Sequence, residues 1–344
     1  MGAKCMKISF LVTYYNQKDF VKQSLDSILA IEKPCDWEIV VGDDGSTDGT
    51  IEVVNEYVKL YPDNIKLYVM PRELGKKYDS VIRASANRIN ILEHSTGDFF
   101  CTLDGDDYYC DTHFVKEAID IFEKHTDVTA VAFGFRYFNE DKLGEINILP
   151  EEFKDKTIDK RTYLKNYYLH AGAFVYKKNY DNSRIEYIKK LGFFDDNNIV
   201  INSLNYGDMY VVNRPIYAYR QTGESVYTSM NQLEQAVLNV QGMDVDIRLI
   251  KDVFKEDVTE RYATAVILIY IWKNKIKLVL GEDKFDRYIK GCESLKPSYC
   301  YKLMNYAELE SEKRDIKLFV KKLMRKKKKY TLKQYIKYFF RRTA

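Results

Sequence analysis

An apolar run that ends directly in carboxylates occurs in the segment Phe99-Phe100-Cys101-Thr102-Leu103-Asp104-Gly105-Asp106-Asp107. Its apolar half has the length and composition of a buried strand. On both sides of it, strand patterns alternate with helical patterns. We expect strands at 7–13, 37–42, 65–70 and 99–103, and helices at about 20–30, 48–61, 80–93 and 112–124. This alternation predicts an α/β fold with a mostly parallel, Rossmann-like sheet and helices on both faces.

The composition is that of a large globular chain. It has 344 residues, of which 46% are hydrophobic, and this suits about two domains with a sizeable core. The formal net charge is only +3, so the chain as a whole does not have the charge of a nucleic-acid binder. None of the six cysteines forms a C-x-x-C pair, and we expect free thiols in a reducing cytosol rather than a zinc site.

No segment reaches the ~18 apolar residues that a membrane-spanning helix needs. The longest apolar stretch, at 263–272, is interpreted as a buried helix. The N-terminal apolar run at 8–12 is too short for a signal sequence. We therefore expect a cytoplasmic location.

Polar residues follow three of the predicted strands, at Thr13–Asn16, Asp43–Gly49 and Asp104–Asp107. Because parallel strands present their carboxyl ends at one edge of the sheet, where ligands bind, these stretches should converge. The three carboxylates of the last stretch repel one another unless a hard cation neutralises them, and Mg²⁺ or Mn²⁺ takes such oxygen ligands together with substrate phosphates. Gly105 allows close approach of the backbone. The alternative is a solvated acidic turn that caps the following helix.

Other nucleotide motifs are missing from the sequence. Neither G-x-x-x-x-G-K-[ST] nor G-x-G-x-x-G occurs, so P-loop and dinucleotide-binding folds lose their main support. A calcium EF-hand is excluded by spacing, because Tyr109 and Val115 stand where that loop has its glycine and terminal glutamate. Asp43, at a strand end, is placed to accept hydrogen bonds from a nucleobase or ribose, whereas Asp48 has only a helix-capping role.

At these residues the chain resembles family 2 glycosyltransferases, which are inverting enzymes with the GT-A fold. The resemblance is carried by Thr13-Tyr14-Tyr15-Asn16, by Glu38-Ile39-Val40-Val41-Gly42-Asp43-Asp44-Gly45-Ser46-Thr47-Asp48-Gly49-Thr50 and by Gly97-Asp98-Phe99 through Asp107. The three stretches come in the family's order and at similar spacings, with Thr13 in place of the usual proline. From this resemblance we expect a GT-A domain over 1–228. The residues from about Asn231 onward have a helical pattern rich in Lys, Glu and Leu, Ile and Val, so we expect a helical C-terminal region over 229–344.

The resemblance also implies how a nucleotide sugar is bound, with UDP as the first choice of nucleotide. The nucleobase and ribose would be held by Thr13, Tyr15 and Asp43. Asp104, next to Gly105, would contact the ribose or the metal, and Asp106 would bind the Mn²⁺ or Mg²⁺ that bridges the diphosphate. For Asn87, on the helix before the fourth strand, two alternatives stay open: it approaches the nucleotide, or it is an ordinary helix-surface residue.

A weaker match lies in Asp195-Asp196 and in the strand that ends at Tyr219-Arg220. Asp196 takes the position of the catalytic base, with Asp195 as the rival, since a carboxylate there accepts the proton of the attacking hydroxyl. The alternative is a helix N-cap or a charge that pairs with the helix dipole. Arg220 would stabilise the diphosphate leaving group. Thr222 stands where relatives have a histidine, so water or another residue would complete the ligands of the metal.

His170 is one of only four histidines, and we interpret it as a structural residue without a catalytic role. The tail at 313–342 interleaves Lys and Arg with apolar residues. As a helix it would be amphipathic, and it either lies on an anionic membrane surface or packs its apolar face on the catalytic domain. No nucleic-acid-binding motif accompanies this local charge, so we expect no nucleic-acid partner.

Together with the acidic strand ends, the resemblance thus implies metal-dependent, inverting sugar transfer from a nucleotide-diphosphate sugar to a hydroxyl of a glycan or lipid-linked glycan, in bacterial surface polysaccharide biosynthesis. The enzyme would be cytoplasmic or peripheral at the inner face of the cell membrane. Two alternatives remain. A nucleotidyltransferase would need a basic, Gly-rich loop after the first strand. The residues at that place, Thr13–Asn16, include neither a glycine nor a basic residue. A catalytically degenerate GT-A scaffold at the membrane is disfavoured by the intact Asp104, Asp106 and Asp196.

Overall fold

The computed structural model describes residues 6–250, except 140–141, 165–167, 222–237 and positions 240, 241, 243, 244 and 247. All of the described residues belong to one compact unit, Met1–Tyr262. Four predictions fall outside the described residues: the domain boundary at 228, the apolar helix at 263–272, the replacement of a metal ligand at Thr222, and the basic tail at 313–342. These stay predictions.

The first half of the fold is the predicted alternation of strands and helices. Its strands are β1 (Lys7–Tyr14), β2 (Asp36–Asp43), β3 (Ile65–Val69) and β4 (Phe99–Asp104). They pair in parallel, in the order β3-β2-β1-β4. Most residues of both β1 and β2 are buried, because both faces of a parallel sheet are covered.

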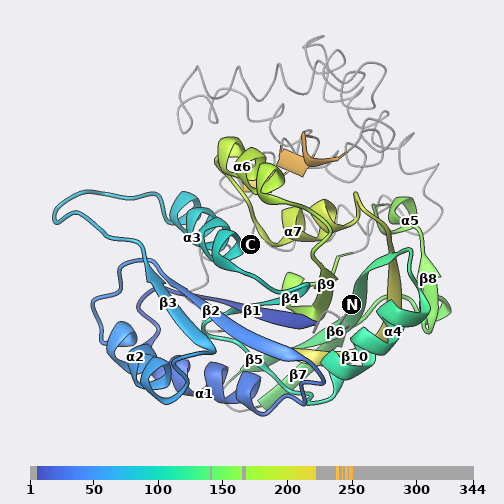
Figure 1. The fold of residues 1–344 in the computed structure, drawn as a ribbon, viewed down its shortest axis with the longest axis horizontal. Helices are drawn as coiled ribbons and strands as arrows, with labels where there is room; N and C mark the ends of the chain where they lie inside the picture. The colour runs from blue at the N-terminus through green and yellow to red at the C-terminus, as the bar shows by residue number, and fades with distance from the viewer. Residues whose placement is uncertain are drawn as a thin grey trace, which may run out of the picture. The chain divides into compact units, whose positions relative to one another are not determined.

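Helices lie on both faces of this sheet, as the sequence predicts (Figure 1). One face is covered by α1 (Lys18–Leu29) and α2 (Thr50–Leu60), and the other by α3 (Ser80–His94), α6 (Asn182–Leu191) and α7 (Asp196–Ser203). Helix α3 begins at Ser80 because the Asp79 carboxylate accepts hydrogen bonds from two backbone N–H groups of the first turn. None of the described helices is long and apolar enough to cross a bilayer.

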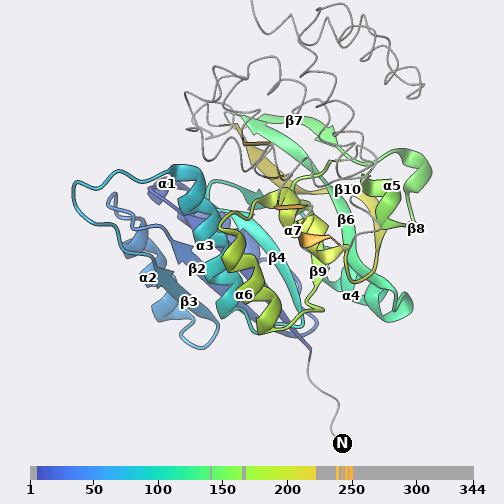
Figure 2. The same ribbon diagram turned by 90° about the horizontal axis from the view of Figure 1, so that it is seen from above.

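The second half extends the same sheet, but not in chain order. Strand β9 (Phe174–Lys177) lies antiparallel between β4 and β6 (Val128–Asn139), and β10 (Asp208–Arg220) pairs in parallel with β6. Figure 2 shows the result from above, with β3 at one side and β6 and β10 at the other. The sheet is therefore mostly parallel in its first half and mixed beyond β4.

Short elements complete this second half. Three strands, β5 (Tyr108–Tyr109), β7 (Lys142–Asn147) and β8 (Lys156–Ile158), pair antiparallel with β10 or β6. Helix α4 (Phe114–Lys124) precedes β6 and packs Phe114 against Phe133. The remaining elements are the short helix α5 (Lys160–Leu164) and the 3₁₀ turns η1 (Glu151–Phe153) and η2 (Ala171–Ala173).

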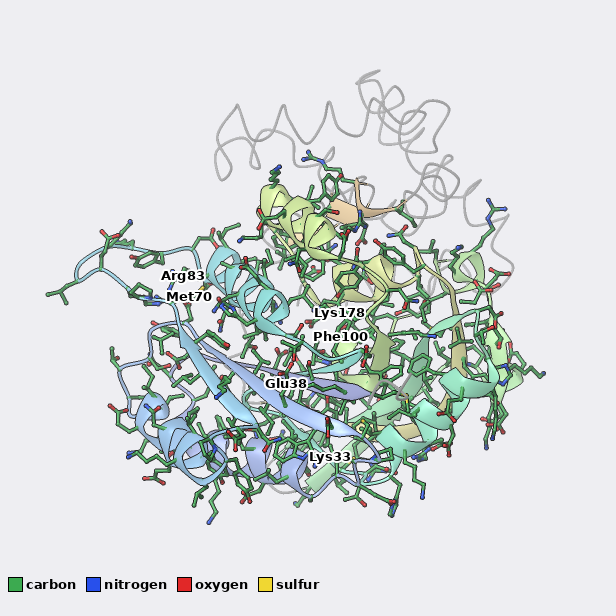
Figure 3. The ribbon with its side chains drawn as sticks, viewed as in Figure 1. Lys33, Glu38, Met70, Arg83, Phe100 and Lys178 are labelled. Carbon is green, nitrogen blue, oxygen red and sulfur yellow. The ribbon has the colours of Figure 1, made fainter. Side chains whose placement is uncertain are left out.

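The amino ends of the strands are tied together by the buried carboxylate of Glu38, labelled in Figure 3. It accepts hydrogen bonds from Lys7 Nζ, Ser9 Oγ and the Thr96 backbone N–H, each 2.6 Å long. Because these partners come from β1 and from the turn before β4, they fix the register of the central strands. The carboxyl ends, at the opposite edge, are left for ligands.

Candidate active site

The three polar strand ends meet at one edge of the sheet. Thr13 of β1 lies opposite Gly42 of β2 on one side and opposite Asp104 of β4 on the other. Tyr14 lies opposite Asp43. The Thr13 hydroxyl donates to Asp104 Oδ1 over 3.3 Å. Residues separated by about ninety positions in the chain are thus brought into contact, as the parallel topology requires.

The side of the site formed by β1 and β2 contains Asp43 and Tyr15. Asp43 is fully buried, and its carboxylate accepts hydrogen bonds from the Ser46 backbone N–H (2.7 Å) and hydroxyl (2.6 Å). Burial raises the pKa of the Asp43 carboxyl, although these two hydrogen bonds oppose the shift. The Tyr15 ring is 44% exposed, and the Arg72 guanidinium lies 3.9 Å from its centroid. An exposed aromatic face beside a buried acceptor is suited to a planar, hydrogen-bonding ligand.

The loop between β3 and α3 is anchored on Asp44. This carboxylate forms ion pairs with both Arg72 and Arg83. Arg72 also donates to the Asp44 carbonyl over 2.7 Å, and Arg83 donates to the Met70 carbonyl over 3.1 Å (Figure 3). The role of Asp44 is thus to fix the base of this loop, which holds Arg72 above Tyr15.

Asn87 supports the end of β2 from α3. Its side chain is buried and donates to the Gly42 carbonyl over 2.9 Å. A Cβ at Gly42 would lie 2.3 Å from Asn87 Oδ1, so the strand can approach the helix this closely only with glycine. These contacts favour a supporting role for Asn87 over direct contact with a nucleotide.

The next residue of α3, Arg88, links two carboxylates from different elements. Its Nη2 lies 3.3 Å from Asp104 Oδ1 and 3.1 Å from Asp196 Oδ1. His170 Nε2 lies 3.6 Å from Asp104 Oδ2 and 3.4 Å from Asp196 Oδ2. Burial acts to raise the pKa of Asp104, but Arg88 and His170 outweigh it and hold that pKa below its ordinary value. Asp104 and Asp196 are therefore bridged twice, by a guanidinium and by an imidazole.

One ligand atom each from Asp104, His170 and Asp196 lie within 4.8 Å of one another, so this trio could hold a metal ion by spacing alone. The Gly172 backbone N–H donates to His170 Nδ1 over 3.2 Å, and Nε2 faces the two carboxylates. Arg88 already supplies a positive charge between Asp104 and Asp196. We refer to Arg88, Asp104, His170 and Asp196 as the ion cluster.

Asp106 and Asp107 differ sharply although they are neighbours. No ion pair or side-chain hydrogen bond joins the Asp106 carboxylate to another described residue, and burial together with the charge of Asp104 raises its pKa. Asp107 is buried and accepts from the Tyr217 hydroxyl (2.5 Å) and the Arg220 backbone N–H (2.7 Å). Asp107 thus holds β10 in place, while Asp104 and Asp106 form a charged pair that a hard cation would stabilise.

Arg220, at the end of β10, lies over the acidic turn. Its Nε donates to the Asp106 carbonyl over 2.7 Å, and its Nη2 contacts the Gln23 side chain. The guanidinium also lies 4.7 Å from the centroid of the Phe20 ring and 4.8 Å from that of the Phe138 ring. The positive charge is therefore held next to Asp106 and against two aromatic rings.

The structure distinguishes Asp195 from Asp196. Asp195 is the N-cap of α7: its carboxylate accepts from the Asn198 backbone N–H (3.0 Å), and Asn198 Oδ1 accepts from the Asp195 backbone N–H (2.9 Å). Asp196 is the next residue, and its carboxylate contacts Arg88 and His170. Of the two roles that the sequence leaves open for this pair, the structure thus gives the helix N-cap to Asp195.

The cap residue gives a prediction about pH. Burial raises the pKa of Asp195 to about 6, with the charge of Asp196 adding to the shift. Because the folded protein binds this proton more tightly than the unfolded chain, the stability that this group contributes is complete below about pH 4 and is lost as the pH rises to about 6. Asp195→Asn keeps the capping oxygen and removes the charge. Relative to the wild type, its free energy of unfolding should rise by up to roughly 3 kcal/mol between these pH values.

Urea titrations at intervals of one pH unit measure this difference directly. The same stability difference between variant and wild type at both ends of the range would show that Asp195 does not titrate in the folded state as described.

Gly105 gives a second prediction. A Cβ at this position would lie 2.1 Å from the Tyr14 ring, which is buried and hydrogen-bonded to Ser24 and so cannot move aside easily. We expect Gly105→Ala to lower the free energy of unfolding by about 1–3 kcal/mol through overpacking. Gly144→Ala is the matched control, since its nearest neighbour would be 3.2 Å away. Equal melting temperatures for the two variants would contradict the close packing described for Gly105.

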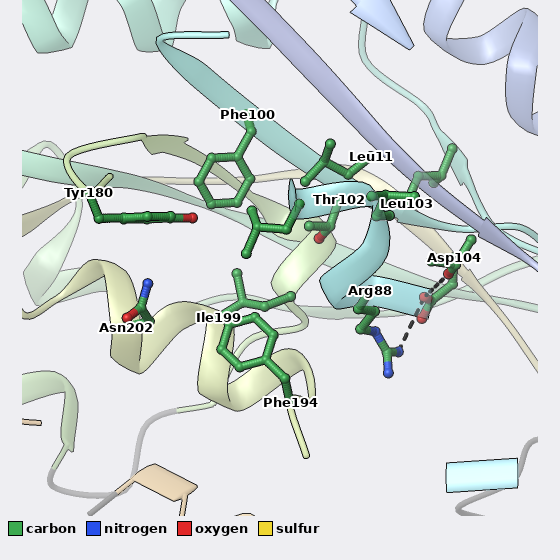
Figure 4. A pocket seen from close by; sticks show the side chains of 13 residues that line it. Leu11, Arg88, Phe100, Thr102, Leu103, Asp104, Tyr180, Phe194, Ile199 and Asn202 are labelled. Atoms are coloured by element: carbon green, nitrogen blue, oxygen red, sulfur yellow. Dashed lines mark hydrogen bonds and ion pairs between the residues drawn. The ribbon is translucent and has the colours of Figure 1, made fainter. Parts of the chain in front are cut away.

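A pocket of about 380 Å³, part of it open to solvent, lies between β4 and the helices α3 and α7 (Figure 4). Arg88 and Asp104 lie at one end of it, and Phe100, Phe194 and Ile199 line its apolar part. A diphosphate would find few partners among these apolar side chains. The polar end of the pocket is formed by Arg88 and Asp104 of the ion cluster, and its apolar part lies between α7 and the sheet.

A family model described as "Glycosyl transferase family 2" matches residues 9–184, just over half of the chain, and includes all three polar strand ends. The chain belongs to glycosyl transferase family 2. The residues matched to family 2 end before α7, so Asp196 and Arg220 lie beyond them.

Individual relatives agree with this family. The EpsE protein of Bacillus subtilis is 33% identical over 144 residues, which cover 42% of this chain and 48% of that protein. The poly(ribitol-phosphate) beta-glucosyltransferase of Bacillus spizizenii is 32% identical over 104 residues, covering 30% of this chain and 15% of that protein. The first relatives are thus matched over only about half of their length.

Among solved structures, the crystal structure of S. aureus TarS 1-349 in complex with UDP has a TM-score of 0.55. The sequence identity is 17%, and the match covers 88% of this chain and 87% of that chain. At this identity the likeness bears on the fold alone. The GT-A fold predicted from the sequence is confirmed.

Two residues of the ion cluster were not assigned to the site from the sequence. Arg88 follows Asn87, which was singled out, but a shift of one residue turns a side chain by about 100° around a helix. For His170 the sequence alone favours a structural role, because a single histidine outside any motif has no partner residue at a characteristic spacing. Its position at the start of η2, immediately before β9, becomes informative only once β9 is known to lie beside β4.

Proposed function

We propose that the chain is an inverting glycosyltransferase that moves a sugar from a nucleotide-diphosphate sugar, with UDP as the preferred nucleotide, to a hydroxyl of a glycan or lipid-linked glycan. The observation that carries this proposal is the meeting of Asp104 and Asp196, from β4 and α7, at the edge where the strands that bear Thr13 and Asp43 also end. Family membership supports the same reaction class.

In this proposal the donor lies along the carboxyl ends of β1, β2 and β4. The nucleobase would lie against the Tyr15 ring and bond to Asp43, with Thr13 beside the ribose. Arg72 lies against the same ring and adds a positive charge beside it. An aromatic face combined with a buried acceptor recognises a planar base by shape and by hydrogen bonding.

Asp104 and Asp106 would hold a divalent cation, Mn²⁺ or Mg²⁺, whose charge offsets that of the diphosphate. The raised pKa of Asp106 is consistent with this assignment, because burial and the nearby charge of Asp104 disfavour its charged form and a bound cation would offset both. Arg220, which lies over the same turn, would stabilise the negative charge that develops on the leaving diphosphate.

Asp196 would act as the general base. Its carboxylate accepts the proton of the acceptor hydroxyl as that oxygen forms a bond to the anomeric carbon, while the bond from that carbon to the diphosphate oxygen breaks. Attack from the face opposite the leaving group inverts the anomeric configuration. Arg88 and His170, in contact with the two oxygens of Asp196, would orient the carboxylate for this transfer.

The acceptor is proposed from the relatives. The name of one of them, a poly(ribitol-phosphate) beta-glucosyltransferase, describes addition of glucose to a polyol phosphate polymer. By analogy, we assign this chain to bacterial surface polysaccharide biosynthesis, with the enzyme in the cytoplasm or at the inner face of the membrane. Contact of the tail at 313–342 with anionic lipid would bring the site close to a lipid-linked acceptor.

The test is release of UDP from a panel of UDP-sugars, with and without Mn²⁺, using water as the default acceptor. Metal-dependent release supports the proposal. No turnover of any nucleotide sugar offered, in the presence of Mn²⁺ or Mg²⁺, would contradict it and favour a non-catalytic scaffold.

A further inference from the structure

Asp246 is a carboxylate outside the proposed chemistry, and its side chain is fully buried. It belongs to the helical positions described between 238 and 249, which follow the catalytic sheet in the chain. Asn197 Nδ2 donates to its Oδ2 over 2.7 Å, and Asn198 Nδ2 donates to its Oδ1 over 2.5 Å. Burying a charged carboxylate is costly unless it is well hydrogen-bonded, so these two amides matter to the position of the group.

Both donors lie in the first turn of α7, directly after Asp196. Asn198 has a second task, since it closes the capping box with Asp195. Its amide also donates to the Gly242 carbonyl over 3.2 Å. The start of α7 is thereby joined to Asp246 by the residues on the C-terminal side of Asp196. A carboxylate near a helix N-terminus is also favoured by the helix dipole.

The other end of α7 is held by the same segment. Asn205 Nδ2 donates to the Leu249 carbonyl over 2.8 Å. Arg184, from α6, donates to that carbonyl over 2.7 Å and to Asn202 Oδ1 over 2.8 Å. Val245 and Leu249 are buried in the main hydrophobic core. Helix α7 is therefore fixed at one end by Asp246 and at the other by Leu249, and both residues lie outside the part of the chain matched to the family.

We propose that Asp246 is a positioning residue for the reaction: by fixing the first turn of α7, it sets the direction of the Asp196 carboxylate toward Arg88 and His170. This inference rests on the proposed function, because it takes Asp196 as the base. Displacement of a catalytic group by about 1 Å can lower a rate by about 100-fold. Loss of the contact between Asp246 and the first turn of α7 should therefore lower the rate of the chemical step.

The test compares Asp246→Ala and Asp246→Asn with wild type in the full chain. The readouts are kcat for UDP release from the most active UDP-sugar with Mn²⁺, the dissociation constant of UDP with Mn²⁺, and the melting temperature. Asp246→Ala should lower kcat at least tenfold, and the dissociation constant should stay within twofold of wild type. Asp246→Asn should lower kcat less than Asp246→Ala does, because its amide oxygen still accepts a hydrogen bond from one of the two asparagines. If Asp246→Ala folds poorly, Asp246→Asn provides the test of kcat.

Ser9→Ala is the control for stability alone. It removes two buried hydrogen bonds, to Glu38 and from the Gly97 N–H, at the opposite edge of the sheet. It should lower the melting temperature and leave kcat of the folded protein unchanged. If both Asp246 variants, like Ser9→Ala, lower the melting temperature and leave kcat unchanged, the inference is wrong. It is also wrong if they weaken UDP binding and leave kcat unchanged.

Asp196→Asn in the same assay separates the two proposals. If it is inactive while both Asp246 variants keep the wild-type kcat, only the positioning role fails. If the wild type releases no UDP, or if Asp196→Asn matches it, the proposed function fails and the inference fails with it.

Discussion

Asp196→Asn should reduce sugar transfer by about 10²–10⁴-fold, the usual contribution of a general base, while the protein still binds UDP with Mn²⁺. The amide keeps the shape of the side chain but cannot take up the proton of the acceptor hydroxyl. Of the two carboxylates at the start of α7, only Asp196 contacts Arg88 and His170, whereas Asp195 is bonded to the backbone as a cap. Steady-state rates of UDP release, with binding measured by calorimetry, test this.

Asp195→Asn is the matched control, because it makes the same chemical change one residue away and preserves the cap. It should keep kcat within a few-fold of wild type at pH 7. A wild-type rate in Asp196→Asn would show that the base is elsewhere, and loss of activity in Asp195→Asn alone would transfer the role to Asp195.

Asp106→Ala should abolish the dependence of donor binding on metal. The Asp106 carboxylate has no ion-pair partner among the described residues, and burial and the charge of Asp104 disfavour its charged form, so we propose a cation as its partner. Removing it should weaken UDP binding at least tenfold in Mn²⁺, since the interaction of a bound metal with phosphate oxygens is worth several kcal/mol. Calorimetry with UDP at several Mn²⁺ concentrations measures this effect.

The control for this variant is Asp111→Ala, five residues further along. Asp111 forms an ion pair with Arg214 and lies outside the site, so its loss should leave the effect of Mn²⁺ intact. Unchanged enhancement of UDP binding by Mn²⁺ in Asp106→Ala would remove Asp106 from the metal site.

The first half of the fold could be predicted from sequence because its signals are local. The apolar runs that become β1, β2 and β4 each end in polar residues, and parallel pairing alone places Thr13 beside Asp104. The convergence of the strand ends followed from this without any knowledge of side-chain contacts.

Other features depend on contacts between distant parts of the chain and could not be predicted. The insertion of β9 between β4 and β6 brings His170 to the site, and no local pattern specifies that order. No pattern in the sequence indicates what Asp107 contacts, and in the structure it accepts hydrogen bonds from the Tyr217 hydroxyl and the Arg220 backbone N–H, on a strand more than a hundred residues away. Similarly, the contact of Asp196 with Arg88 depends on where α3 places Arg88.

The central claim is that the acidic strand ends bind a divalent cation and a nucleotide diphosphate together. It is tested most directly by titrating the full chain with UDP, with Mn²⁺, and with both, in a single set of calorimetric measurements. We predict that each ligand strengthens binding of the other by the same factor, as linkage requires, and that Asp106→Ala abolishes this coupling. Equal UDP affinity with and without Mn²⁺ in the wild type, or no binding of UDP at all, would contradict the account.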